Sequence, residues 1–324
     1  MLIKKVLYSF LAVLLLLVIS TLAMGYKMAK VATVPDYNYG QNYDTAFAMV
    51  YRAYPEMKPW YDSLVENGFV RDTFLTNAEG LRLHGILMEH PETDSIPVTS
   101  AVMLIHGYCD DAPVMMRYTY CDYEVLHQNV FLPERRWCGK SEGDHITFGH
   151  LDCQDMHLWL EMMHDLWQKP IFVHGLSMGA TTTMLLSGDS IDDRLKVRGF
   201  IEDCGYSTTW DLLAHQIVED HDLPVFPTLY AASLINRIWH GWWFSDGNAI
   251  EQVRKCTRPM LFIHGKDDKL VPFKMVYDVF RAKRGKKTLW EVPDTGHAKS
   301  IHKHWNDYCK CVGDFIKDAL SNQE

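Results

Sequence analysis

Ser177 is the middle residue of a G-x-S-x-G motif at residues 175–179. An apolar run at 170–173 precedes the motif, and residues 181–186 are typical of the start of a buried helix. A serine held between a strand and a helix in this way forms a nucleophile elbow, whose strained turn exposes the hydroxyl group. The two glycines are required because larger side chains would meet the adjoining strand and helix. The motif therefore predicts that Ser177 is a nucleophile, with an oxyanion stabilised at the helix N-terminus.

A serine nucleophile needs a base, and the base needs a carboxylate that orients it. Asp268 follows an apolar run at 260–263, and His297 follows another at 288–292. Serine, aspartate and histidine in this chain order form one of the known kinds of catalytic triad. Because each residue comes just after a predicted strand, we expect all three side chains at one edge of a sheet.

The elements that must position these residues are strands that alternate with helices. Eight segments have strand patterns: 69–76, 81–89, 101–105, 129–132, 171–173, 197–201, 260–263 and 288–292. The first two alternate in polarity around a turn at 77–80, which predicts an antiparallel hairpin. The other six are apolar runs separated by helical segments near 120–128 and 152–167, which is typical of a parallel sheet covered on both faces. The sequence predicts an α/β protein with a doubly wound sheet.

Three of the predicted strands end in a histidine followed by a glycine, at His106, His174 and His264. Histidines gathered at one sheet edge are also a possible metal site. Each of these histidines directly precedes a glycine at a turn, however, so packing and local hydrogen bonds explain them. We expect neither a metal nor an organic cofactor.

From about residue 69 to the C-terminus, the sequence resembles the α/β-hydrolase superfamily, especially its bacterial esterase-like and serine-aminopeptidase-like branch. The resemblance is carried by Leu104-Ile105-His106-Gly107-Tyr108, Gly139-Lys140-Ser141-Glu142-Gly143, Gly175-Leu176-Ser177-Met178-Gly179, Ile201-Glu202-Asp203-Cys204-Gly205-Tyr206, His264-Gly265-Lys266-Asp267-Asp268-Lys269-Leu270-Val271-Pro272 and Gly296-His297-Ala298. It implies an α/β-hydrolase fold with a helical cap. It also implies Ser177 as nucleophile, His297 as base and later acid, and Asp268 as the orienting carboxylate.

The resemblance further implies an oxyanion hole formed by the backbone N–H groups of Met178 and Tyr108. Asp267 competes with Asp268 for the role of the acid, but the family places the acid four residues after the histidine, which favours Asp268. Asp294, close to His297, is interpreted as a turn residue.

Cys138 departs from the family pattern, which has a histidine at this position in the segment Arg136-Trp137-Cys138-Gly139-Lys140-Ser141. We expect this position to shape the rim of the site, so the change bears on substrate preference. A role for Cys138 as a rival nucleophile is disfavoured because no elbow motif surrounds it. The eight cysteines form no disulfide framework and are interpreted mainly as buried apolar residues, although a bridge between Cys109 and Cys138 is conceivable.

Residues 201–260 contain no strand pattern and are rich in aromatic residues. A connection of this length is usually functional, so we predict a helical cap within about 207–252, with extra packing at the sheet edge as the alternative. Glu219, Asp220 and Asp222 lie in this segment. They would favour an aminopeptidase if they held a substrate amine, but a solvated turn explains them equally well.

Residues 6–25 are apolar and uncharged, and Lys4 and Lys5 precede them. This length approaches the ~20 residues that span a bilayer. We predict an uncleaved membrane anchor within 1–30, with the basic end in the cytoplasm and the rest of the protein outside it. A cleaved signal peptide, and hence a secreted or periplasmic protein, is the alternative. Residues 31–68 are interpreted as a linker, at 31–43, and a helical lead-in, at 44–66, to the hydrolase domain at 69–324.

The composition, 48% hydrophobic and 23% charged, is that of a globular protein, and the net charge of −9 argues against nucleic acid as a partner. We therefore expect a membrane-anchored serine hydrolase that cleaves an ester or related acyl bond through an acyl-enzyme. A peptidase, aminopeptidase or thioesterase using the same triad is the alternative. A non-catalytic binding protein is less favoured, because such proteins usually lack a triad member.

Overall fold

The computed structural model describes residues 2–35 and 43–321. Its internal contacts divide the chain into two units. Met1–Asp36 and Thr208–Gly247 form one unit, called the helical unit below. Tyr37–Ser207 and Asn248–Glu324 form the other, called the body.

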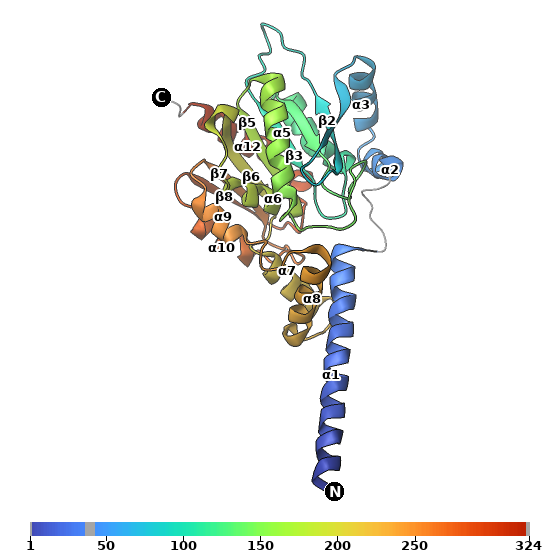
Figure 1. The fold of residues 1–324 in the computed structure, drawn as a ribbon. Helices are drawn as coiled ribbons and strands as arrows, with labels where there is room; N and C mark the ends of the chain where they lie inside the picture. The colour runs from blue at the N-terminus through green and yellow to red at the C-terminus, as the bar shows by residue number, and fades with distance from the viewer. Residues whose placement is uncertain (1, 36–42, 322–324) are drawn as a thin grey trace. The chain divides into compact units, whose positions relative to one another are not determined.

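The body is built on an eight-stranded sheet with the strand order β1-β2-β4-β3-β5-β6-β7-β8 (Figure 1). The strands are β1 Val70–Thr76, β2 Arg82–Met88, β3 Ala101–Ile105, β4 Asn129–Pro133, β5 Ile171–Leu176, β6 Val197–Asp203, β7 Met260–Gly265 and β8 Lys287–Val292. β2 pairs antiparallel with β1 and β4, and the remaining pairs are parallel. The predicted hairpin and the mostly parallel sheet are both confirmed.

Helices cover the sheet on both faces. The α-helices of the body are α2 Tyr43–Ala53, α3 Met57–Glu66, α4 Met116–Tyr120, α5 Asp152–Trp167, α6 Met178–Ser187, α9 Ala249–Lys255, α10 Lys274–Ala282, α11 Ser300–Lys303 and α12 Trp305–Ser321. Short 3-10 or π segments lie at η2 Ala112–Met115, η3 Cys121–Val125 and η4 Asp193–Leu195. The lead-in helix is interrupted as its prolines require: α2 ends before Pro55, and Pro59 lies in the first turn of α3, where proline is tolerated.

The helix predicted near residues 120–128 is wrong in its bounds. The helical stretch begins at η2, where Pro113 stands in the first turn, and it ends with η3 at Val125. Proline favours helix starts because its missing N–H needs no partner there. The apolar pattern around Tyr120 therefore marked only the end of this stretch.

Alternate residues of the central strands enter two separate cores. Met103 and Ile105 of β3 pack with α5 residues such as Trp159, while Val102 and Leu104 pack with Val312 of α12. All six are fully buried. Since burying one large apolar side chain contributes about 1.5–3 kcal/mol, a sheet buried on both faces is held firmly in place.

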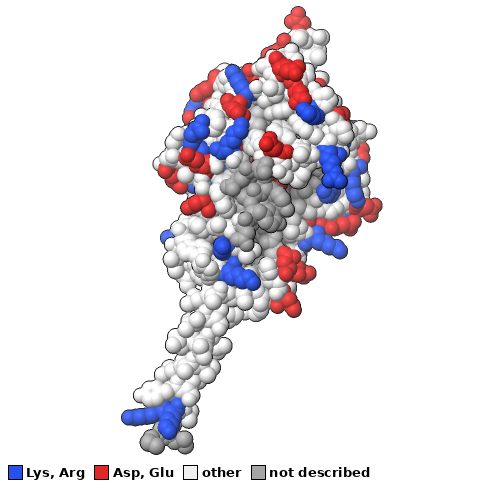
Figure 2. Space-filling model, turned by 90° about the vertical axis from the view of Figure 1, so that its right-hand side faces the viewer, with Lys and Arg blue, Asp and Glu red and all other residues white. Residues whose placement is uncertain are grey.

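The helical unit contains α1 Leu2–Thr33, α7 Thr209–Glu219 and α8 Val225–His240. The predicted anchor lies inside α1, and residues 3–33 form the one helix among the described residues long and apolar enough to cross a membrane. Figure 2 shows the N-terminal part of α1 as a white column with basic atoms near its N-terminal end. The predicted linker begins as part of α1, and its residues 36–42 lie outside the described residues. The segment predicted as a cap is helical and contains α7 and α8.

Candidate active site

Ser177 lies in the tight turn between β5 and α6. Its φ of 54° is in the left-handed region, which costs a non-glycine residue of order 1–3 kcal/mol. Its backbone N–H donates to the Asp203 carbonyl at 2.8 Å, which ties the turn to the end of the neighbouring strand β6. The body thus holds Ser177 in a strained conformation directly before the N-terminus of α6.

The glycines of the motif are required by close backbone approach. A Cβ atom at Gly175 would lie 2.1 Å from the Gly179 carbonyl oxygen, and one at Gly179 would lie 2.0 Å from the Ile105 carbonyl oxygen. Both distances are far inside van der Waals contact, and both obstacles are backbone atoms. Any larger residue at either position would force α6 away from β3 and β5.

The structure brings Ser177, His297 and Asp268 together. His297 Nδ1 lies 2.7 Å from Asp268 Oδ2, and His297 Nε2 lies 2.8 Å from Ser177 Oγ. A carboxylate only accepts hydrogen bonds, so Nδ1 carries the proton and Nε2 accepts from the serine hydroxyl. Asp267, the alternative acid, is exposed and makes a backbone hydrogen bond to the Thr295 carbonyl instead. Asp294 is an exposed turn residue with a φ of 48°.

Asp268 is strongly stabilised as a carboxylate. Its Oδ1 accepts from the backbone N–H groups of Leu270 and Val271 at 3.0 and 2.9 Å. Its Oδ2 faces both His297 and His264, the latter at 3.2 Å. Burial alone would raise the pKa of Asp268, but these hydrogen bonds outweigh it and lower the pKa to about 2. The carboxylate is therefore ionised at any pH at which a histidine base works.

The two segments predicted to carry the oxyanion donors lie beside the serine. Met178 is the first residue of α6 and directly follows Ser177. The backbone at Gly107, the residue before Tyr108, lies close to Ser177. A Cβ atom at Gly107 would be 3.6 Å from the Ser177 Cβ. The loop after β3 and the start of α6 thus flank the hydroxyl group.

Arg135 holds the loop after β3 and is a residue that the sequence analysis missed. Its guanidinium is buried, donates to the Gly107 carbonyl, and lies 3.9 Å from the carboxylate of Asp152. Burial and the nearby Arg135 charge both lower the pKa of His106, the residue before Gly107, so its ring is neutral. The run Arg135-Arg136 after β4 was the available signal, but nothing in it indicates that both side chains are buried or that Arg135 contacts Gly107.

Asp110 is a second missed residue, close to the same loop. Its carboxylate would lie 2.7 Å from a Cβ atom at Gly107. Burial raises the pKa of Asp110 to about 6, although the charges of Arg135 and His297 act in the opposite direction. A group that titrates near neutrality thus lies close to the candidate oxyanion segment.

The cysteines are free thiols, and Cys109 and Cys138 form no bridge. Cys138 is fully buried, which contradicts its expected place on the rim of the site. Burial raises the pKa of its thiol to about 12, so it is not an activated nucleophile.

The three histidines that follow strands have different partners. His106 lies against Arg135, His174 Nε2 lies 2.9 Å from the Tyr308 hydroxyl, and His264 Nε2 contacts the Val271 carbonyl at 3.0 Å. They therefore form no common ligand set.

Another group, Cys204, Asp268 and His297, has ligand atoms within 4.8 Å of one another. Burial raises the pKa of Cys204 well above its usual range, which disfavours the thiolate that a metal would need. Asp268 and His297 are already engaged with each other, so the arrangement fits a triad better than a metal site.

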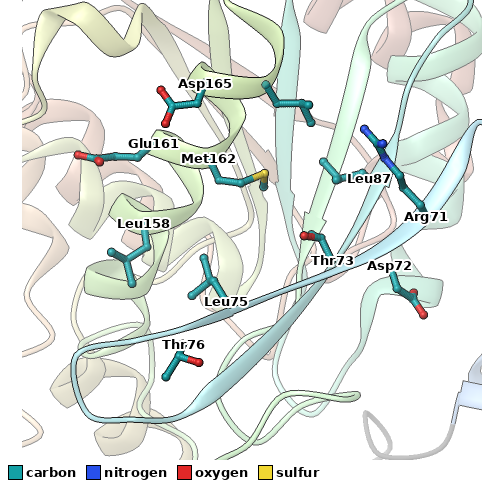
Figure 3. A pocket seen from close by; sticks show the side chains of 11 residues that line it. Arg71, Asp72, Thr73, Leu75, Thr76, Leu87, Leu158, Glu161, Met162 and Asp165 are labelled. Carbon is teal, nitrogen blue, oxygen red and sulfur yellow. The ribbon is translucent and has the colours of Figure 1, made fainter.

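A groove of about 800 Å³ lies elsewhere on the body, between β1, β2 and α5 (Figure 3). Its walls include Leu75 and Leu87 from the strands and Met162 from α5. None of its lining residues belongs to the triad, so we do not connect it with the candidate active site.

The comparisons with known proteins define the class. A sequence model of the alpha/beta hydrolase family matches residues 102–309, and the chain belongs to this family. The match includes Ser177, Asp268 and His297.

Individual relatives are distant. The chain is 26% identical over 227 residues to the uncharacterized protein YqkD of Bacillus subtilis, covering 69% of this chain and 73% of that one. It is 23% identical to the uncharacterized protein YfhR of Escherichia coli K12, covering 83% and 87%. The structure of the esterase Pf2001 of Pyrococcus furiosus aligns with a TM-score of 0.60 at 19% identity, covering 77% of this chain and 90% of the esterase. At this identity, the structural likeness concerns the fold.

Proposed function

We propose that this hydrolase is a serine esterase that uses Ser177 as nucleophile, His297 as base and Asp268 as orienting acid. The observation that carries the proposal is the continuous line of contacts from Asp268 through His297 to Ser177, at 2.7 and 2.8 Å. The strained backbone of Ser177 supports it, because strain is retained where function requires an exposed side chain.

In the acylation step, His297 Nε2 takes the hydroxyl proton as Ser177 Oγ attacks the carbonyl carbon. The oxyanion that forms is stabilised by the N–H groups of Tyr108 and Met178. His297 then gives the proton to the leaving alcohol, and an acyl-serine remains. In the second step, water loses a proton to His297 and attacks the acyl carbon. The acid is released and the Ser177 hydroxyl is restored.

Thioesters and peptides are alternative substrates for the same triad. An aminopeptidase would need acidic groups that hold a substrate amine, whereas Glu219, Asp220 and Asp222 are exposed at the end of α7 and in the turn after it. The likeness to an esterase structure favours oxygen esters as the first substrates to test.

We further propose that residues 1–30 are a retained membrane anchor, with Lys4 and Lys5 on the cytoplasmic side and residues 69–324 acting as the extracytoplasmic hydrolase domain. Two features of α1 support retention. The helix continues without a break to Thr33, and its C-terminal part, including Gly25, packs against α8 of the same unit. A leader destined for removal has no need of such packing. Recovery of a chain that begins after residue 25 would instead support a cleaved signal peptide.

A fluorophosphonate probe tests the proposed nucleophile. The full-length protein should be labelled, and the Ser177→Ala variant should not be. Ser95→Ala is a matched control, because Ser95 lies exposed in a loop far along the chain from the elbow and should leave labelling intact. If the folded wild-type protein remained unlabelled, or if Ser177→Ala were still labelled, the proposed nucleophile would be wrong. The labelled protein should then be assayed on p-nitrophenyl esters, a thioester and an aminoacyl anilide to rank the substrate classes.

A further inference from the structure

The outer face of α8 is apolar. Phe226, Tyr230, Leu234 and Ile238 follow one another at intervals of four residues, and their exposed fractions are 72, 55, 41 and 72%. Tyr230, Leu234 and Ile238 lie on one side of the helix at this spacing. The backbone of Phe226 is not helical, but its ring meets that of Tyr230 edge to face, with the centroids 5.4 Å apart. The stripe is unusual for a helix in water, where the exposed side is normally charged or polar.

α8 packs against α1 at two small residues, Ala231 and Ala232. A Cβ atom at Gly25 would lie 2.6 Å from the Ala231 Cβ, so the two helices are in direct contact at these residues. On α1, Thr21, Gly25, Ala29 and Thr33 recur at intervals of four. Small residues at this spacing allow close helix packing of the kind common between helices in membranes. Small residues of α8 such as Ala231 thus allow the close approach to α1, whereas the large residues of the stripe are exposed.

The contact with α1 fixes the depth of α8 relative to the proposed membrane span. Residues 6–26 of α1 carry no charge, and a helix of this length matches the ~30 Å hydrocarbon core of a bilayer. Gly25 is the next-to-last residue of this stretch, two residues before Lys27 and five before Lys30. The residues of α8 that touch Gly25 must therefore lie near the boundary between hydrocarbon and headgroups.

Aromatic residues at this level fit the same boundary. The rings of Tyr26 and Trp239 meet edge to face, with their centroids 4.8 Å apart. Trp243, just beyond α8, is also exposed. Tyrosine and tryptophan concentrate at membrane interfaces because one side of the ring is apolar and the other forms hydrogen bonds. Arg237 is the one Lys, Arg, Asp or Glu residue in α8, and its long side chain can extend from an apolar face to the phosphates.

We propose that α8 is a second membrane-binding element, embedded in the interfacial layer of the lipid bilayer through Phe226, Tyr230, Leu234 and Ile238. With 16 residues, α8 is too short to span a bilayer, so it lies in the interface as an amphipathic helix would. The proposal rests on the proposed anchoring through α1, because α1 sets the depth of α8. The lipid surface, together with the anchor, then determines the position of the segment 208–247 relative to the membrane.

Site-directed spin labelling of the full-length protein in phosphatidylcholine–phosphatidylglycerol vesicles tests this proposal. A nitroxide would be attached to Ile238→Cys, to Leu14→Cys as the lipid reference and to Glu219→Cys as the water reference. All three positions are exposed, so the substitutions should not disturb folding. The unsubstituted protein, treated with the same reagent, serves as the blank for the native cysteines, seven of which are buried.

The expected result is that oxygen relaxes the labels at positions 238 and 14 more strongly than a water-soluble nickel chelate does, with the order reversed at 219. Two results would overturn the proposal while leaving the anchor intact, each with position 14 in lipid. In the first, position 238 behaves like position 219. In the second, neither reagent reaches position 238, which would indicate that protein, such as a second copy of the chain, covers α8. If position 14 also behaved as aqueous, the anchoring itself would fail, and this proposal with it.

Discussion

Two regions of the body each place a histidine between polar partners, but only one has the arrangement of a catalytic site. His297 lies between Asp268 and Ser177 and its side chain is 17% exposed. His84, on β2, is fully buried between two carboxylates, with Nδ1 2.7 Å from Glu134 and Nε2 3.0 Å from Asp72. Both ring nitrogens of His84 thus face oxygen atoms of acids, and neither is open to a nucleophile.

The partner of the second ring nitrogen determines the role of each histidine. In both regions, a carboxylate contacts Nδ1 and orients the histidine ring. Around His84, the remaining partners are also structural: Tyr43 donates to Glu134, and the Lys140 backbone N–H donates to the same carboxylate at 2.6 Å. This cluster fastens α2, β2 and the loop after β4 together. The second ring nitrogen of His297, Nε2, faces the Ser177 hydroxyl group, and the ring is partly open to solvent, as a general base requires.

The sharpest test of this comparison is His297→Ala. Loss of a triad base lowers kcat about 10⁶-fold, equivalent to about 8 kcal/mol of transition-state stabilisation. The ring is partly exposed at the surface, so we expect thermal unfolding to change little. The measurement is kcat on an ester identified in the substrate panel, together with the melting temperature. Activity within a hundredfold of wild type would break the comparison, because His297 would then not be the base.

Asp268→Asn should have the next largest effect. An amide in place of the carboxylate no longer forces the proton onto Nδ1 of His297, and in a comparable triad this change costs about 10⁴ in kcat. Asp267→Asn is the matched control, since its side chain is adjacent in sequence but exposed, and it should leave kcat unchanged. The reverse ranking of the two variants would make Asp267 the acid.

His84→Ala should affect stability instead of chemistry. Removing the ring takes away the hydrogen-bond partner that lies 2.7 Å from the buried carboxylate of Glu134, and leaving a buried polar group without such a partner costs about 1–3 kcal/mol. The denaturation midpoint should fall accordingly, while kcat per folded molecule stays the same. If a folded His84→Ala protein lost its turnover, His84 would belong to the catalytic machinery and the contrast with His297 would be false.

Much of the fold was predictable because it depends on local patterns. The six apolar runs predicted as strands lie entirely within the observed β3 to β8, and five of these strands extend one to three residues further. Buried parallel strands need continuous apolar residues, and this requirement is visible in the sequence. The elbow was predictable for a similar reason: Gly175 and Gly179 are fixed by backbone contacts that no other residue allows.

The missed features depend on contacts between distant segments. Nothing around Arg135 indicates that its guanidinium is buried against Gly107, because that contact exists only once β3 and β4 are neighbours. The packing of α8 on α1 joins residues separated by most of the chain. The roles of Ser177, Asp268 and His297 remain predictions until they are tested as above.

The smallest expected effect concerns acid stability. The pKa of Asp268 is about 2 in the folded protein, whereas the ordinary value is 3.8. A carboxyl group whose pKa is lowered by folding stabilises the protein above its ordinary pKa, and this contribution is lost as the pH falls from about 4 to 2. Wild type should therefore lose about 2 kcal/mol over this range that Asp268→Asn does not lose.

The corresponding acid beside His84 sharpens the contrast. Burial would raise the pKa of Asp72, but hydrogen bonds from Lys140 and His84 lower it overall. Its side chain is 47% exposed, however, so water screens these interactions and Asp72→Asn should change the acid dependence less than Asp268→Asn does. Urea denaturation of the three proteins between pH 5 and pH 2 measures both slopes. Equal slopes of the free energy of unfolding against pH for the two variants would mean that a stabilised carboxylate is not specific to the candidate triad. A flatter slope for Asp268→Asn alone would locate that stabilisation at His297 and His264.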